Sequence, residues 1–309
     1  MRALLTTLNF NRASLNTAAL PVAEKTLLAL LCGLSAYITV SGLTWPQNAE
    51  STLQFVGTAS IFTSTLLLRH YLNLGKCDYF LRYVLFASMI SFLYVALGEL
   101  AFSHMPWQSD NLLFAIEKGL QLELLHTEYA PSLTSHRWIT EVLAFSYCAF
   151  IPYLQLSFLY NGMQSDSRLR ELFLTAIAIM YSIGFFGYLF VPASGPIVLL
   201  QDLNLVPVEG GFFYQVVTNS IDQAGGPHGA FPSIHMSAAL MMCLFDFKYG
   251  KRKRAFLYIP IVVLIALATV LLRYHYVIDL IAGAALAVLS LAIATAWIKP
   301  HNSHIGVEK

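Results

Sequence analysis

The sequence is poor in charge. Only 11% of its 309 residues are Asp, Glu, Lys or Arg, whereas a soluble domain carries about 25%. This shortage argues against a soluble domain with a charged surface. The net charge is only +1, so the basic surface expected of a nucleic-acid binding protein is also lacking. We therefore expect no nucleic-acid partner.

Cysteine is scarce as well. The chain has 4 cysteines, and they lie far apart in the sequence, at Cys32, Cys77, Cys148 and Cys243. Their spacing matches neither a disulfide framework nor a metal-binding motif. Most of them fall within apolar runs, where a free cysteine behaves as a small hydrophobic residue. The sequence thus predicts no bound metal and no cofactor.

What the chain has in abundance is apolar residues, at 57% of the total. They form runs near 24–44, 52–72, 79–103, 139–162, 169–192, 232–248, 254–273 and 276–298. A helix needs about 20 apolar residues to cross a bilayer, and only the run at 232–248 is short. We predict an all-α polytopic membrane bundle of about eight transmembrane helices. Residues 1–138 would supply N-terminal membrane helices and an amphipathic interfacial helix over 114–125, and residues 139–309 a catalytic core.

The Lys and Arg residues test this arrangement. With eight spans, the long connections 104–138 and 193–231 lie on one side of the membrane, which we call side X. Both termini and the remaining positive loops lie on the opposite side, Y. Of the 18 Lys and Arg residues, only Lys118, Arg137 and Arg273 fall on side X. Because positive loops stay in the cytoplasm, side Y and both termini are predicted to be cytoplasmic. The short loops favour a bacterial inner membrane.

Two histidine motifs lie on side X. Residues 229–235 read GAFPSIH, and residues 273–279 read RYHYVID. The forty residues between His235 and His275 correspond to about 60 Å of helix, which is two passes through the membrane. The spacing therefore returns both imidazoles to the same depth, on the extracytoplasmic face.

The residue types in these motifs suit phosphoryl transfer through a phosphohistidine. His275 is the predicted nucleophile. Asp279, four residues later, would orient its ring and stabilise the imidazolium. His235 would act as general acid and then as general base. Arg273 suits a bound phosphate. Gly229 and Ser233 would let phosphate approach the backbone N–H groups at a helix start.

Two further residues are weaker candidates for contact with substrate. His228 lies in the same loop as Gly229, although a solvated loop histidine is the commoner case. Ser194, in an Ala-Ser-Gly-Pro stretch, also fits an ordinary turn residue.

The two motifs resemble the second and third signatures of the type 2 phosphatidic acid phosphatase superfamily. The most similar branch contains inositol phosphorylceramide synthases and sphingomyelin synthases, and the segment from Phe190 to Pro196 is similar to an FP-x-x-GP segment of that branch. The resemblance spans about residues 140–298. It implies a six-helix catalytic core, with His275 as nucleophile, Asp279 as its partner and His235 as acid/base.

The sequence departs from the superfamily pattern at several cationic positions. The first signature is absent, Thr269 stands where an arginine is usual, and Ile197 stands where many relatives have Arg. Loss of cationic residues favours a phosphodiester or lipid headgroup over a strongly charged phosphomonoester. We therefore favour a lipid phosphotransferase that acts on a membrane lipid and a polar or lipid acceptor. A lipid-phosphate phosphatase, acting on phosphatidic acid or a polyprenyl pyrophosphate, is the alternative. A non-catalytic lipid-binding or transport protein remains a third hypothesis.

Overall fold

The computed structural model describes residues 19–44, 49–72, 77–102, 108–201, 208–224 and 226–298. All regular elements within these ranges are helices. Eight long helices coincide with the eight apolar runs: α2 (Val22–Thr44), α3 (Ala49–Tyr71), α4 (Cys77–Phe102), α7 (Arg137–Gly162), α8 (Ser167–Phe190), α11 (Ile234–Lys248), α12 (Arg252–Leu271) and α13 (Val277–Trp297). The predicted helical bundle is thereby confirmed.

Six of these helices are long and apolar enough to cross a membrane, namely α2, α4, α7, α8, α12 and α13. This is what an integral membrane protein requires. Within the described residues, α3 and α11 do not reach that standard. Helix α3 carries many Ser and Thr residues. Helix α11 has only 15 residues, because it begins at Ile234, directly after its N-cap Ser233.

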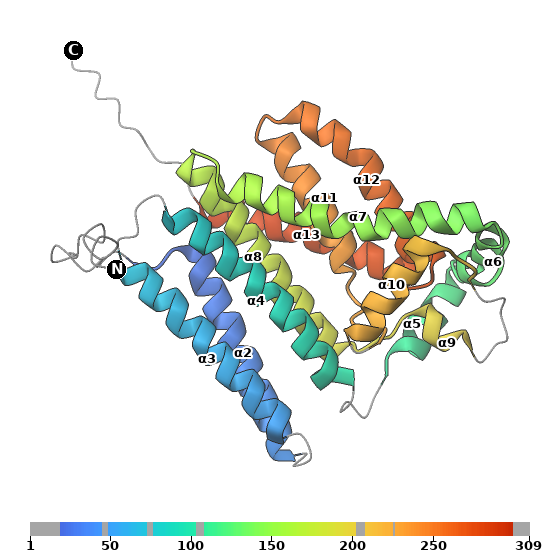
Figure 1. Cartoon of the computed structure of the whole chain (residues 1–309), viewed down its shortest axis with the longest axis horizontal. Coiled ribbons are helices and arrows are strands. Elements are labelled where there is room, and N and C mark those ends of the chain that lie inside the picture. Colours follow the sequence, from blue (N-terminus) through green and yellow to red (C-terminus); the bar gives the residue numbers. More distant parts are fainter. Residues whose placement is uncertain are drawn as a thin grey trace.

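Helix α8 lies at the centre of the bundle. It packs against α2, α4, α7, α11 and α13, and most of its side chains are buried. Helices α2 and α3 form a pair at one edge, while α11 and α12 form an antiparallel hairpin at the opposite edge (Figure 1). Helices α2 and α4 therefore pack on the same central helix as α11 and α13, which lie next to the two histidine motifs.

The helix ends that the charge pattern assigned to side Y meet in the structure. Arg82 bridges Glu24 of α2 and Glu171 of α8, and Arg69 also contacts Glu24. At the start of α12, Arg254 pairs with Asp246 of α11. Buried charges need such partners, so these contacts join the helix ends on this side.

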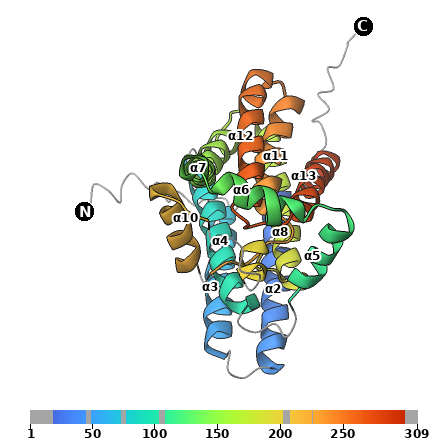
Figure 2. The ribbon, with the colours of Figure 1, turned by 90° about the vertical axis from the view of Figure 1, so that its right-hand side faces the viewer.

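Short helices gather at the opposite end: α5 (Asp110–Gly119), α6 (Ala130–Thr134), α9 (Pro196–Leu199) and α10 (Phe212–Gln223). Figure 2, which faces this end, places α10 and α5 on opposite sides of it. They come from the two long connections, which therefore fold over the end of the bundle that carries the histidine motifs.

The helix predicted over 114–125 was wrong in its boundaries. Helix α5 begins at Asp110 and ends at Gly119, and a π-helical turn, Leu125–Tyr129, follows. The amide of Leu122 donates to the Glu117 carbonyl, and Gln121 adopts a left-handed conformation with φ 59°. This pattern is a Schellman ending, and it stops the helix before the apolar run is finished.

Candidate active site

Three loops are joined by backbone hydrogen bonds at the end of the bundle that carries both histidines. The Ala230 amide donates to the Ala193 carbonyl (3.0 Å), and the Ile197 amide donates to the Arg273 carbonyl (2.7 Å). Gly195 has φ +91°, and a Cβ there would lie 2.3 Å from the Tyr274 carbonyl oxygen. Only glycine allows this approach, so the loop around Gly195 lies directly against the His275 loop.

His275 lies in a loop, two residues before α13, and is 4% exposed. Its Nδ1 is 2.9 Å from the carbonyl oxygen of Ala230. Because a carbonyl only accepts hydrogen bonds, Nδ1 carries the hydrogen and Nε2 keeps its lone pair. The loop geometry thereby leaves Nε2 as the ring nitrogen that carries the lone pair.

Asp279 lies in the first turn of α13 and is fully buried. Its Oδ2 is 3.5 Å from His275 Nδ1 and accepts a 2.8 Å hydrogen bond from the Tyr276 amide. The predicted proximity of Asp279 to His275 is confirmed. His275 itself precedes the helix, and its Nδ1 also faces the Ala230 carbonyl. The carboxylate still lies where it stabilises a positive charge on the ring.

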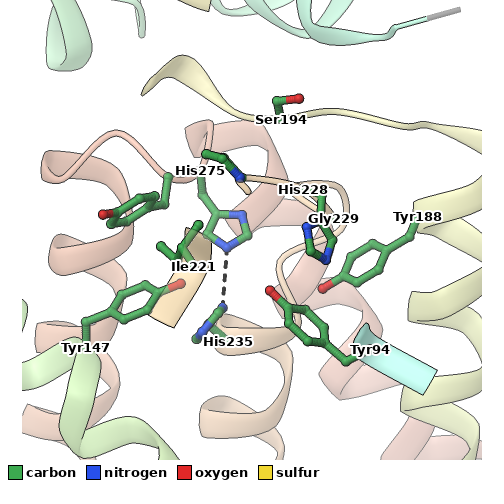
Figure 3. A pocket seen from close by; sticks show the side chains of 11 residues that line it. Tyr94, Tyr147, Tyr188, Ser194, Ile221, His228, Gly229, His235 and His275 are labelled. Carbon is green, nitrogen blue, oxygen red and sulfur yellow. Dashed lines mark hydrogen bonds between the residues drawn. The ribbon is translucent and has the colours of Figure 1, made fainter. Parts of the chain in front are cut away.

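His235 lies in the first turn of α11. Its Nδ1 is 3.4 Å from His275 Nε2 (Figure 3). Two rings of α7 pack on it, with Tyr147 and Phe150 each at 4.7 Å between ring centroids. The two imidazoles, which the spacing predicted to lie at the same depth, are in contact in the structure.

A cavity of about 340 Å³, counting its open mouth, lies beside the two histidines. It is lined by Tyr94, Tyr147, Tyr188, Ser194, Ile221, Pro227, His228, Gly229, His235, Tyr274 and His275. The hydroxyl ends of Tyr94, Tyr147 and Tyr188 point toward the imidazole pair (Figure 3). None of the described residues that line it is Lys or Arg, so its polar groups are imidazoles, hydroxyls and backbone.

Gly229 and His228 both line the cavity. Gly229 has φ +67°, and a Cβ there would lie 2.7 Å from the Tyr188 ring. The His228 ring stacks on Tyr94, with centroids 5.2 Å apart, and its Nδ1 contacts the Gly226 carbonyl at 2.7 Å. Burial lowers the pKa of His228, although its contacts with the backbone of Gly226 and Tyr94 act in the opposite direction. His228 is therefore neutral at pH 7 and contributes hydrogen-bonding capacity without charge.

Of the remaining predicted residues, Ser194 lines the cavity, whereas Ser233 and Arg273 do not. The Ser194 amide donates to Asp110 of α5. Ser233 is fully buried and caps α11, accepting a hydrogen bond from the Met236 amide; its hydroxyl is thus engaged in the helix start. Arg273 is 5% exposed and does not line the cavity. Burial lowers its pKa, while nearby Tyr214 raises it.

Sequence reasoning did not single out Tyr94, Tyr147, Tyr188 or Asp110. The chain has 16 tyrosines, and spacing alone does not separate those that face a cavity from those that face lipid. Tyr94 belongs to α4, a helix outside the two histidine motifs. Asp110 is one of several acids in the side X connections, and only its hydrogen bonds distinguish it.

Comparison with known proteins supports the resemblance seen in the motifs. Residues 111–293 match the PAP2 superfamily. A curated protein of Dictyostelium discoideum, described as a PA-phosphatase related-family protein, is 30% identical over 178 residues. That alignment covers 49% of this chain and 31% of the relative, so the chain spans less than a third of the relative's length. No solved structure gives a significant match.

Proposed function

The chain belongs to the PAP2 superfamily, and on that premise we propose that it is an integral-membrane enzyme that transfers a lipid phosphate or phosphorylated headgroup through a phosphohistidine. The observation that carries this proposal is the contact between His275 and His235 at the wall of the cavity. One imidazole offers a lone pair and the other a proton, which are the two requirements for displacement at phosphorus.

In the first step, Nε2 of His275 attacks the phosphorus atom and an Nε2–P bond forms. The P–O bond to the leaving group breaks, and protonated His235 donates a proton to the departing oxygen and becomes neutral. The buried carboxylate of Asp279, 3.5 Å from Nδ1, stabilises the positive ring that results. The Ala230 carbonyl keeps the Nδ1 hydrogen in place throughout.

In the second step, neutral His235 takes a proton from the hydroxyl of an acceptor. The acceptor oxygen attacks phosphorus, the Nε2–P bond breaks, and His275 is restored. Water as acceptor makes the enzyme a phosphatase, whereas another molecule's hydroxyl makes it a phosphotransferase. We propose the transferase, because the cavity lining offers hydroxyls and imidazoles rather than the cations that a dianionic phosphomonoester needs.

The roles of the other candidates follow from their positions. Gly229, His228 and Ser194 would contact substrate at the cavity wall. Arg273 and Ser233 would act on phosphate at longer range, through charge and through the start of α11. We keep residues 139–309 as the catalytic core and propose that Tyr94, from the N-terminal part, completes its cavity.

The deciding experiment uses the purified full chain in phosphatidylcholine vesicles. Labelled phosphatidic acid, a polyprenyl pyrophosphate and labelled phosphatidylinositol are supplied separately, each with and without a lipid alcohol such as diacylglycerol or ceramide. We expect label to move to the alcohol from the phosphodiester lipid. Acceptor-independent release of phosphate from phosphatidic acid or the pyrophosphate contradicts the transferase and supports a lipid-phosphate phosphatase. No turnover in any arm leaves the third hypothesis, a binding or transport protein.

The proposed topology places the histidines on the extracytoplasmic face of a membrane, with both termini, which lie outside the described residues, in the cytoplasm. Single cysteines at two exposed positions, Asp222→Cys near the cavity and Lys253→Cys at the far end, test it in a cysteine-free chain. A membrane-impermeant maleimide should label only the former in intact bacterial cells. The reverse pattern contradicts the assignment.

A further inference from the structure

Two carboxylates of α5 reach into the loops that carry His275. Asp110 is 7% exposed and Glu117 is fully buried. Neither lines the cavity, and neither belongs to the motifs that indicated the function. A buried carboxylate costs free energy unless it is well hydrogen-bonded, so the groups that each one contacts reveal its role.

Asp110 joins two of the three loops of the site. It accepts hydrogen bonds from the amides of Ser194 (2.9 Å) and Gly195 (2.8 Å). It also accepts one from the hydroxyl of Tyr276, at 2.9 Å. Tyr276 follows His275 directly and is fully buried. One carboxylate therefore fixes both the loop that lies against the His275 segment and the residue next to the nucleophile.

Glu117 fixes the start of α13. Its Oε1 accepts from the Ile278 amide at 3.2 Å, and its Oε2 lies 3.0 Å from Nε2 of His126, which is also fully buried. Asp279 satisfies the Tyr276 amide in the same turn. First-turn amides lack partners within their own helix. Glu117 and Asp279 supply partners for two amides at this helix start, and so they fix the direction in which the His275 loop enters α13.

From these contacts we propose that Asp110 and Glu117 are positioning residues that hold His275 with Nε2 facing His235 and the cavity. The inference rests on the proposed function, since it assigns these carboxylates a part in the same reaction. They touch no reacting atom. Their effect reaches the nucleophile through Tyr276, Ile278 and the Gly195 loop, and a misplacement of about 1 Å at a reacting atom costs on the order of 100-fold in rate.

The test compares Asp110→Asn, Tyr276→Phe and the double variant, assayed on the lipid that turns over in the vesicle experiment. Each single variant weakens the same contact, so we expect kcat to fall about 10- to 100-fold with KM within about twofold, because the cavity lining is unchanged. The kcat of the double variant should lie only slightly below that of Asp110→Asn. The second change removes the Tyr276 hydroxyl, whose hydrogen bond Asp110→Asn has already weakened. If the two single variants reduce kcat by factors that multiply in the double variant, or if only KM rises, the proposal is overturned. Glu117→Gln should reproduce the kcat effect.

Asp246→Asn is the matched control. Asp246 is also a fully buried, paired carboxylate, but it lies at the other end of α11, next to Arg254. Its loss should lower the unfolding temperature at least as much as Asp110→Asn while kcat stays unchanged. If both variants reduce kcat equally, the effect of Asp110 is one of general stability and the proposal fails.

A second readout does not depend on turnover. Nitrogen-15 NMR of labelled histidine in detergent reports the tautomer of each ring, and His275→Gln identifies the His275 signals. We expect one Nδ1–H tautomer in the unmodified chain and a mixture in Asp110→Asn. If Asp110→Asn shows a mixture of tautomers but the unmodified chain turns over no lipid, the positioning role is supported and the proposed function fails. If the unmodified chain turns over lipid and Asp110→Asn keeps the same tautomer and the same kcat, the proposed function is supported and the positioning role is overturned.

Discussion

Nε2 of His275 lies 3.4 Å from Nδ1 of His235, while Nδ1 of His275 faces the Ala230 carbonyl at 2.9 Å. The first contact occupies the lone pair that attacks phosphorus in the proposed mechanism. That mechanism therefore requires a phosphoryl group to separate the two rings as it enters. The packing of Tyr147 and Phe150 on His235 limits the directions in which that ring can move.

Replacing the nucleophile should abolish turnover. His275→Asn keeps a polar side chain of similar size but has no lone pair suited to attack, and we expect activity to fall by about 10³-fold or more. His136→Ala, an exposed histidine at the start of α7, is the control and should retain activity. The measurement is label transfer in vesicles. Full activity in His275→Asn would exclude the phosphohistidine.

The role of His235 as general acid predicts a dependence on the leaving group. With a lipid alkoxide as leaving group, His235→Ala should reduce turnover about 10²- to 10⁴-fold. With a nitrophenyl phosphodiester the loss should be much smaller, because nitrophenolate departs without a proton. Rates for the two substrates are compared in both proteins. Equal losses would show that His235 does not act by donating a proton.

Gly229→Ala should be more harmful than its conformation alone explains. Gly229 and Gly226 both have positive φ, but a Cβ at Gly229 meets the Tyr188 ring at 2.7 Å, whereas a Cβ at Gly226 meets nothing within 4 Å. Both variants incur the left-handed cost of about 1–2 kcal/mol, seen in the unfolding temperature. Only Gly229→Ala should also lose activity. Similar activity in the two variants would mean that the Tyr188 contact is unimportant.

Tyr94 tests whether α4 takes part in the site. Tyr94→Phe keeps the stacking on His228 and removes the hydroxyl that points toward the imidazoles. Loss of one hydrogen bond to substrate should raise KM about 2- to 10-fold, and Tyr94→Ala should raise it further. Tyr83 lies on α4, as Tyr94 does, and its hydroxyl contacts Gln155 of α7. Tyr83→Phe removes that hydroxyl and should leave KM unchanged. Identical kinetics for Tyr94→Phe and the unmodified chain would remove Tyr94 from the substrate site.

The lowered pKa of His228 predicts a loss of stability in acid. The folded chain binds a proton at His228 at lower pH than the unfolded chain, whose histidine titrates near about 6.5. The free energy of unfolding therefore falls as pH drops below that value. His228→Gln lacks this contribution, so its unfolding temperature should decline less than that of the unmodified chain between pH 7 and pH 5. Parallel declines would contradict a depressed pKa at His228.

The sequence by itself determined the bundle and the common depth of its two histidines. Apolar runs must become helices in lipid, because backbone groups find no other partners there, and a forty-residue separation returns His275 to the depth of His235. The sequence did not predict the left-handed conformation of Gln121 that ends α5 after Gly119. It also did not distinguish the tyrosines of the cavity from those facing lipid, because that difference depends on contacts between distant segments.

Only the tertiary structure decided which groups surround His275. The Ala230 carbonyl at His275 Nδ1 lies 45 residues away in the chain, and the Asp110 carboxylate that binds the Tyr276 hydroxyl lies 166 residues away. Periodicity and motif spacing describe neighbours along one helix or across one hairpin. Contacts such as these arise only when separate loops fold over the same end of the bundle, where each buried polar group must find a partner.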